Sequence, residues 1–390
     1  MFRIIKDPQF DFMRHRKVLL SVSAVLVLIA VGLLFGKGLN RGIEFSGGTQ
    51  IQVRYAEAPD LAGIRTALGS GGFDGAQVTT IGDPADNEID IRIPDAETTE
   101  VSNERIKEVM SVLRTAANAT GDRKTDINAI DSRTLANLLQ GAGTEATAAE
   151  ALAKRVLELR RDNAIFTSYD DLRGQPGVTD QDVAQLQNST SMGPLALRKQ
   201  SYVGPAVGRE LVRKALAAIF GSLIGMLVYI WVRFQLQWGF AAVVALAHDT
   251  LITLGLFSLF GQELSLAVVA AFLTLVGYSV NDTVVVFDRI RENIKNRGKG
   301  SIEETINMSL NQTLSRTIIT SGLTWVAVLG IFLFGGEALR PFAFVLTVGV
   351  LVGTYSSIYV AAPFLVMWTE WLAKRRSQTA TKVPAGGNAS

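Results

Sequence analysis

Long apolar blocks constrain this chain more than any other feature of its sequence. One block lies near the N-terminus, and a dense run of apolar segments extends from about residue 211 to residue 372. A helix needs roughly 20 apolar residues to cross the hydrocarbon core of a bilayer. We therefore predict an α-helical polytopic membrane protein with six transmembrane helices, at Val18–Phe35, Leu211–Val232, Phe240–Phe260, Leu264–Phe287, Thr317–Phe334 and Pro341–Trp371.

The first apolar block has one feature of a signal peptide, because the basic run Arg14-His15-Arg16-Lys17 precedes it. A signal peptide also needs a small-x-small cleavage site after the apolar core. The following residues, Phe35-Gly36-Lys37-Gly38-Leu39-Asn40, do not contain one. We interpret this block as a retained membrane anchor.

Lys and Arg residues set the orientation, because cytoplasmic connections are enriched in them. The short connections Gly261–Glu263 and Gly335–Arg340 contain one basic residue between them, Arg340. An even number of spans then places both termini in the cytoplasm and residues 39–210 outside, in the periplasm of a bacterium. The basic residues lie in the cytoplasmic tail 1–17, after the fourth span and in the tail 373–390, which we expect to be disordered: Arg3, Lys6, Arg14, Arg16, Lys17, Arg289, Arg291, Lys295, Arg297, Lys299, Lys374, Arg375 and Arg376.

Composition limits the chemistry that the 390 residues can perform. The net charge of +2 does not favour nucleic-acid binding. The absence of cysteine excludes disulfides, thiol catalysis and cysteine-ligated metals, and two histidines leave little room for a histidine metal site. Because no nucleophile–base pair, phosphate loop or metal cluster occurs in the sequence, we predict no catalytic residues, no cofactor and no enzymatic activity.

The segment 39–210 has the composition of a soluble domain. Strand-like alternation occurs at Gly48–Tyr55, Gln77–Ile81, Glu88–Ile93 and Leu195–Val203, and helical spacing at Ala58–Leu68 and Val101–Ala117. The order β-α-β-β-α-β is that of a ferredoxin-like unit. We predict an α+β head domain of this kind, with Gly47-Gly48 forming a turn before its first strand.

Residues 123–190 interrupt that order between the second helix and the last strand. Helices are predicted at Ser132–Gln140, Ala146–Asn163 and Thr179–Gln187. The sequence around these helices resembles a tandem helix-hairpin-helix domain, a module that often binds the DNA backbone through glycine hairpins. Because basic residues are few here and the domain faces outward, we predict an insert that packs or docks a partner and does not bind DNA.

Asp282 lies about two-thirds along the fourth predicted span, within Gly277–Asn293. An ionised Asp at the bilayer centre costs roughly 2.5–3.5 kcal/mol on insertion scales, so such a residue is a functional candidate. Asn281 and Thr283 could hydrogen-bond its carboxyl. The functional hypothesis is proton handling, and the structural alternative is a permanently paired Asp that holds two helices together.

Two further candidates lie near the middle of the third span. Asp249 is deeper in the membrane than Asp282, and His248 titrates near neutral pH when solvated. The pair could relay protons, but adjacent helix positions point about 100° apart and need not touch. Arg316, at the start of the fifth span, could act on the aspartates or could snorkel to the interface.

One more helix is predicted between the fourth and fifth spans. Ser301 and Glu304 form a capping box before apolar Ile306 and Leu310. This pattern predicts a short amphipathic helix along the inner surface of the membrane.

Four motifs, in order along the chain, resemble the SecF family of protein-export membrane proteins. They are Arg41–Thr49, Val203–Gly208, Gly277–Asn293 and Asn307–Thr317, and the similarity covers about residues 1–120 and 195–372. The 123–190 insert departs from the family pattern.

The resemblance implies a six-span member of the resistance–nodulation–division superfamily, located in the inner membrane. It implies a subunit that pairs with SecD, assists the SecYEG channel, has YajC as a companion and uses the proton motive force to pull a translocating preprotein outward. It also implies that Asp282 belongs to the charged residues tied to proton flow, with Arg316 as an electrostatic partner of the aspartates.

Two alternatives stay open at this point. One is a proton-driven small-molecule or lipid exporter of the same superfamily, although such exporters commonly have twelve spans and two large outer domains. The other is a membrane scaffold without transport activity, which would tolerate removal of the carboxyl of Asp282.

The predicted orientation can be tested by cysteine labelling, because the native chain has no cysteine. We expect a cysteine at Ser70 to react with an impermeant maleimide in intact spheroplasts, and a cysteine at Ser377 to react only after lysis. The reverse labelling pattern would overturn the topology.

Overall fold

The computed structural model describes residues 8–82, 84–94, 99–117, 125–163, 165–233, 236–297, 301–336 and 338–381. The chain divides into two compact units, Met1–Arg41 with Arg213–Ser390, and Gly42–Val212. Each unit has hydrophobic cores of its own and is treated by itself below.

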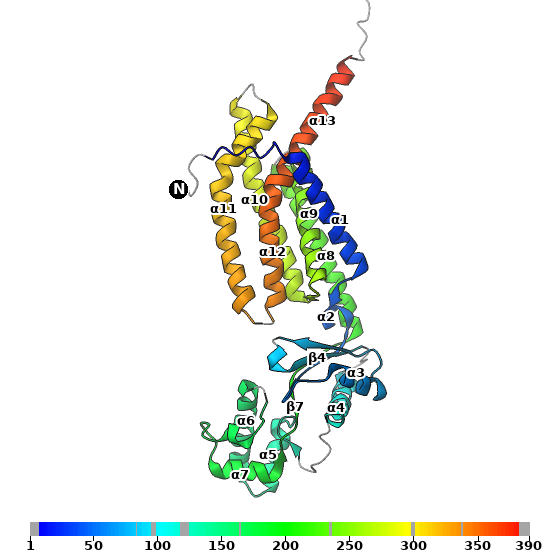
Figure 1. Ribbon diagram of the computed structural model, residues 1–390, viewed down its shortest axis with the longest axis vertical. Helices are drawn as coiled ribbons and strands as arrows, with labels where there is room; N and C mark the ends of the chain where they lie inside the picture. The colour runs from blue at the N-terminus through cyan, green and yellow to red at the C-terminus, as the bar shows by residue number, and fades with distance from the viewer. Residues whose placement is uncertain are drawn as a thin grey trace, which may run out of the picture. The chain divides into compact units, whose positions relative to one another are not determined.

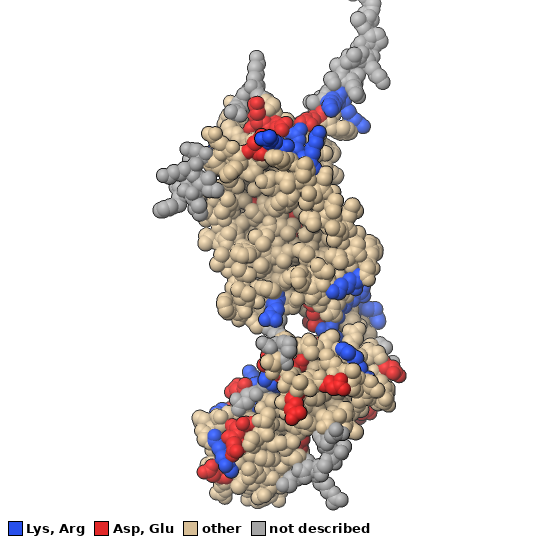
Figure 2. Space-filling model, in the orientation of Figure 1, with Lys and Arg blue, Asp and Glu red and all other residues tan. Residues whose placement is uncertain are grey.

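The first unit is a helical bundle. Its described residues contain six helical spans long and apolar enough to cross a membrane, which confirms the predicted number, and α12 and α13 together make the sixth. Helices α10, α11 and α12 pack against one another, and α1 lies along α9 (Figure 1). On the face shown in Figure 2, charged side chains gather at the two ends of the bundle, with an almost uncharged band between them. The helices are α1 (Arg16–Gly36), α8 (Pro205–Arg233), α9 (Leu236–Leu259), α10 (Leu266–Arg297), α11 (Ile302–Phe334), α12 (Arg340–Ser356) and α13 (Ala362–Thr381).

The short amphipathic helix predicted after the fourth span is not a separate element. Ser301 does cap a helix, since its hydroxyl accepts from the backbone N–H of Glu304, 3.1 Å away. That helix is α11, which continues without a break into the fifth span. The prediction was wrong because no proline or glycine stands between residues 302 and 321 to end the helix.

The sixth span contains a change of helix type that the sequence pattern did not indicate. A π-helical turn, Ser357–Ala361, joins α12 to α13. Helix α13 then continues to Thr381, so the expectation of disorder from residue 373 was wrong for residues 373–381. The sequence there, Ala-Lys-Arg-Arg-Ser-Gln-Thr-Ala-Thr, contains no helix breaker. The rest of that predicted tail, 382–390, lies outside the described residues, as do residues 1–7 of the N-terminal tail.

Helix α1 approaches α9 closely at a glycine. A Cβ added to Gly255 would lie 2.4 Å from the Cβ and 2.6 Å from the Cα of Ala30. Ala30 is buried at this crossing, with 4% of its surface exposed. Small residues of this kind let two membrane helices pack with their backbones close together.

In the second unit, the predicted head strands form one antiparallel sheet in the order β3-β4-β2-β7. This is the strand order and direction of a ferredoxin-like unit, with α3 and α4 covering one face. The predicted turn is also present, because Gly47 has a φ of 73° and Gly48 a φ of 112°. The elements are β2 (Gly48–Tyr55), α3 (Leu61–Ser70), β3 (Gln77–Ile81), β4 (Glu88–Ile93), α4 (Thr99–Ala116) and β7 (Leu195–Val203).

The interrupting segment has a hydrophobic core that shares no residue with the core of the sheet. Its three predicted helices are present as α5, α6 and α7, and two short strands pair in parallel where the segment joins the head. Residues 118–124, where the segment begins, lie outside the described residues. The elements are β5 (Thr125–Asp126), α5 (Ser132–Gly141), α6 (Ala146–Asn163), α7 (Asp180–Ser189) and β6 (Thr190–Ser191).

Polar contacts join the two ends of this segment, near the paired strands β5 and β6; this region is called the neck below. Asn128 is fully buried, and its side chain donates to the carbonyl of Phe166 and accepts from the N–H of the same residue, at 2.8 and 2.9 Å. Burial raises the pKa of the Asp126 carboxyl, while the N–H of Asn128 and the charge of Arg114 oppose that rise. The Arg114–Asp126 ion pair, 3.3 Å long, joins α4 of the head to the neck.

Because the two cores are separate, we predict that residues 123–190 are dispensable for folding of the head. A short Gly/Ser replacement should leave the isolated 39–210 region with cooperative melting by circular dichroism, since the cost of loop closure grows slowly with loop length. Leu113→Asp, in the head core, is the control that should abolish melting in either form. Non-cooperative melting after the replacement alone would show that the segment belongs to the head core.

The prediction that the segment does not bind DNA has a separate test. A gel shift with duplex DNA at physiological salt would contradict it.

The crossing of α1 and α9 generates a second prediction. Gly255→Leu should destabilise the protein by about 1–3 kcal/mol, because the added side chain meets the backbone of Ala30. Gly322→Leu is the matched control in another span, where an added Cβ meets nothing within 4 Å. Thermal unfolding of the purified protein in detergent measures both, and equal midpoints for the two variants would contradict the close approach.

Candidate functional site

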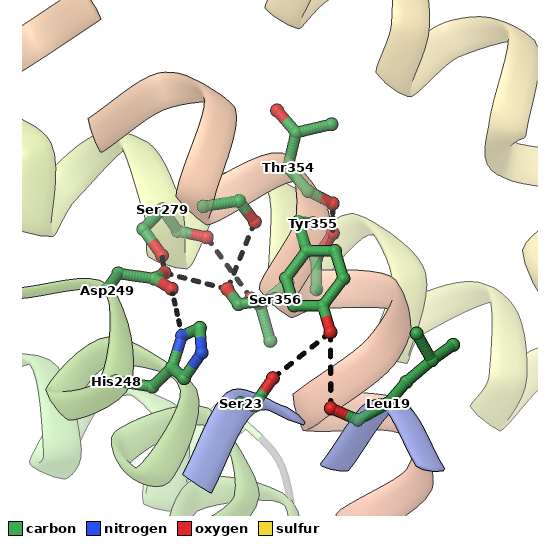
Figure 3. A network of polar contacts seen from close by, with 11 residues as sticks. Leu19, Ser23, His248, Asp249, Ser279, Thr354, Tyr355 and Ser356 are labelled. Carbon is green, nitrogen blue, oxygen red and sulfur yellow. Dashed lines mark hydrogen bonds and ion pairs between the residues drawn. The ribbon is translucent and has the colours of Figure 1, made fainter. Parts of the chain in front are cut away.

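Asp249 lies within the bundle and has no exposed surface. Its Oδ2 accepts hydrogen bonds from the hydroxyls of Ser279 on α10 and Ser356 on α12, at 2.5 and 2.7 Å (Figure 3). Gly353 of α12 also faces the site, where an added Cβ would lie 3.5 Å from that oxygen, an ordinary van der Waals contact. Three helices therefore meet at one carboxyl.

His248 does contact its neighbour in sequence. Its Nδ1 lies 2.9 Å from Asp249 Oδ1, and the ring N–H donates when the carboxyl is ionised. The ring is 6% exposed and stacks on Tyr355 with 6.2 Å between centroids. The hydroxyl of Tyr355 in turn lies 3.1 Å from Ser23 Oγ and 3.3 Å from the carbonyl oxygen of Leu19 (Figure 3). The network thus reaches the first span.

Asp282, on α10, is held by two hydroxyl groups from other segments. Thr317 of α11 donates to Oδ1 at 3.1 Å, and Ser357 of the π-helical turn donates to Oδ2 at 3.2 Å. The residue is 6% exposed. Its carboxyl therefore lies inside the bundle, where an ionisable side chain is costly unless it has a partner or loses its charge.

Arg316 makes no direct ion pair with Asp282 in the described part of the chain. It is exposed, although its charge acts on the carboxyl through space. Arg316 precedes Thr317 on α11, and consecutive helix positions point about 100° apart. Thr317 therefore takes the inward place beside Asp282, and Arg316 lies on the surface of the bundle.

The expectation that Asn281 and Thr283 hydrogen-bond the carboxyl of Asp282 was wrong. Asn281 is exposed, because its position next to Asp282 on the helix turns its side chain away from the bundle interior. Thr283 is buried, but its hydroxyl donates to the carbonyl of Ser279, one turn earlier in the same helix. Such local back-bonding satisfies a threonine hydroxyl without a tertiary partner.

The sequence reasoning missed the hydroxyl residues that complete both sites. Its only available signal was a polar run inside the last apolar span, Thr354-Tyr355-Ser356-Ser357. Serines in membrane helices are common enough to be read as packing residues. The missed residues are Ser356 and Ser357, which belong to that run, and Ser279 and Thr317, which do not.

The Asn307–Thr317 motif has a second role at one end of the bundle. Asn311 bonds the backbone of Phe10 through both its side-chain oxygen and nitrogen, at 2.9 and 2.8 Å. Asn307 accepts from the N–H of Phe12 at 2.8 Å. These bonds hold the segment before the first span against α11, with Phe12 and Met13 buried in the bundle core.

Among the described residues, no group of three or more His, Asp or Glu side chains is arranged to hold a metal ion. A hydroxyl can donate to an ionised carboxylate and can accept from a protonated carboxyl. Both aspartates therefore keep hydrogen-bond partners in either protonation state.

Two family models match the sequence. "Protein export membrane protein SecD/SecF, C-terminal" matches residues 183–371, and "SecD/SecF GG Motif" matches residues 32–58. The second match includes the Gly47-Gly48 turn. Residues 59–182, which include most of the interrupting segment, lie outside both models.

Similar proteins cover almost the whole chain. A protein translocase subunit SecF from Koribacter versatilis is 39% identical, over 95% of each chain. The SecF subunit from Calditerrivibrio nitroreducens is 36% identical, over 95% of this chain and 98% of that one. The crystal structure of SecDF, a translocon-associated membrane protein from Thermus thermophilus, is similar with a TM-score of 0.65 and 31% identity, over 93% of this chain but 39% of the SecDF chain.

Proposed function

Because this chain belongs to the SecF family of protein translocase subunits, we propose that it uses the proton motive force to promote polypeptide export. It is an auxiliary subunit of the Sec translocase and a multi-pass membrane protein. In the proposal it lies in the bacterial inner membrane, with both termini in the cytoplasm and the ferredoxin-like head in the periplasm. Its work is mechanical and not enzymatic.

The partners are proposed from the same family membership. The relatives are named SecF, and the chain is similar to 39% of a SecDF chain, which supports a partnership with SecD. SecYEG, YajC and the translocating preprotein complete the proposed assembly, and nucleic acid has no part in it.

The burial of Asp282 is the observation that supports proton handling most directly. A permanently ionised structural Asp inside a bundle would need a cation in contact, because an unpaired buried charge costs several kcal/mol. Within the described residues the direct partners of Asp282 are the neutral hydroxyls of Thr317 and Ser357. Such a carboxyl is stabilised by taking up a proton, and the positive charge of Arg316 favours release of that proton because it stabilises the carboxylate.

Proton binding at Asp282 would change the bundle, since three segments meet there. The ionised carboxylate accepts from α11 and from the π-helical turn, whereas the protonated carboxyl donates to one of them. The two states therefore hold α10, α11 and the last span together by different bonds, which is the differential contact that a proton-driven conformational change requires. The motion could reach the head through the chain itself, because α1 leads into the head and α8 leads out of it.

Asp282→Asn tests this proposal, because the amide keeps the shape and hydrogen bonding of the carboxyl and cannot titrate. We expect the variant to assemble normally and to lose the part of export that depends on the proton motive force. The measurement is pulse–chase secretion in a strain depleted of the native subunit, with and without a protonophore.

Asp288→Asn is the matched control on the same helix. Asp288 is exposed and pairs with Arg233 at 3.2 Å, and its replacement should leave export unchanged. Wild-type export rates from the Asp282→Asn variant would reject proton handling at this residue and would favour a scaffold.

A further inference from the structure

Three consecutive residues of the last span each contact a different helix. Tyr355 bonds Ser23 of α1, Ser356 bonds Asp249 of α9, and Ser357 bonds Asp282 of α10. Ser356 ends α12 and Ser357 begins the π-helical turn. Single π turns within α-helices are rare and occur frequently at functional sites.

Each of the two serines has two acceptors for one hydrogen. Ser356 Oγ lies 2.7 Å from Asp249 Oδ2 and 3.1 Å from the carbonyl oxygen of Gly353. Ser357 Oγ lies 3.2 Å from Asp282 Oδ2 and 3.0 Å from the carbonyl oxygen of Thr354. Both serines have no exposed surface, so water does not supply an alternative partner at their surface.

The protonation state of each aspartate therefore decides where the serine hydrogen goes. Beside an ionised carboxylate, the hydroxyl donates to the carboxylate. Beside a protonated carboxyl that donates to the serine oxygen, the hydroxyl is free to donate to its own helix carbonyl instead. Those carbonyls belong to the turn of α12 that immediately precedes the π turn, where a side chain bonded into the backbone ladder changes the local geometry.

We propose that Ser356 and Ser357 form a paired hydroxyl switch through which Asp249 and Asp282 sense each other's protonation. The inference rests on the proposed proton handling by Asp282 and adds a second acid to it. Because the serines are adjacent, a change in the backbone bond of one alters the position of the other. The two acids then bind protons as a coupled pair and not independently.

The charged and titratable groups around the pair are few. Asp249 faces His248 from its own helix, and His248 stacks on Tyr355. Asp282 feels the charge of Arg316 from α11. No direct ion pair joins either aspartate to Lys or Arg among the described residues. Each acid is bonded to one of two serines that are adjacent in the backbone, which connects the two sites.

Infrared titration of the full-length protein in lipid nanodiscs tests the coupling. The protonated-carboxyl band of Asp282 is assigned as the one lost in Asp282→Asn, and its titration midpoint is followed against pH. We expect Asp249→Asn to shift that midpoint by about one pH unit or more, the size at which two groups titrate as a pair. In a Ser356→Ala/Ser357→Ala background, the same Asp249→Asn change should leave the midpoint nearly unmoved.

Two further variants control for structure. The Ser356→Thr/Ser357→Thr background keeps both hydroxyls and should keep the shift. This variant also tests the role of the hydroxyls if the alanine variant does not fold. Ser321→Ala removes a buried serine of α11 that contacts neither acid, and it should also keep the shift.

The outcomes separate this inference from the proposed function. An equal shift with and without the serine hydroxyls would show that the acids interact through space only and would overturn the switch. A midpoint that ignores Asp249→Asn in the wild-type background would overturn the coupling while leaving proton handling at Asp282 intact. An Asp282 band that never titrates would overturn both.

Discussion

The packing of the helical bundle depends on two buried carboxyl groups, Asp249 and Asp282, which accept hydrogen bonds mainly from hydroxyl groups. An ionisable group inside a bilayer needs partners from the protein, since lipid supplies none. Here the partners come from several helices, so the acids can be satisfied only when those helices pack closely. Small residues allow helices to pack this closely, as Gly255 does against Ala30. The polar sites therefore require close helix packing.

Polar interactions at different levels of the bundle differ in character. Toward one end, amide side chains such as Asn307 and Asn311 bind the backbone of the segment before the first span, and these bonds do not depend on protonation. Deeper in the bundle, the bonds to Asp249 and Asp282 use hydroxyls, which can reverse the direction of donation. In the proposed mechanism, proton uptake leaves the first set of bonds unchanged and alters the second set.

The second unit follows simpler rules. Alternating apolar residues place Ile51, Val53, Ile89 and Ile91 on one face of the sheet, where α3 and α4 cover them. The interrupting segment closes on itself through Asn128 and a parallel strand pair, and it buries a core of its own. A module with a separate core can be added to the head without rearranging the sheet, which agrees with the position of most of it, residues 123–182, outside both family models.

Patterns local to the sequence were sufficient for the number of spans, the head strands, the helices of the interrupting segment and the family. Each of these depends on hydropathy, alternation or short motifs, which a linear chain displays directly. The two buried aspartates were also visible, because an acid in an apolar span is conspicuous.

Only the tertiary structure decided which groups meet those acids. Thr317 and not Arg316 lies beside Asp282, because neighbouring helix positions point in different directions and the packing of α11 selects one of them. The π-helical turn has no local signature. The polar run that contains Ser356 and Ser357 is visible in the sequence, but which acid each serine meets depends on where α9, α10 and α12 come into contact.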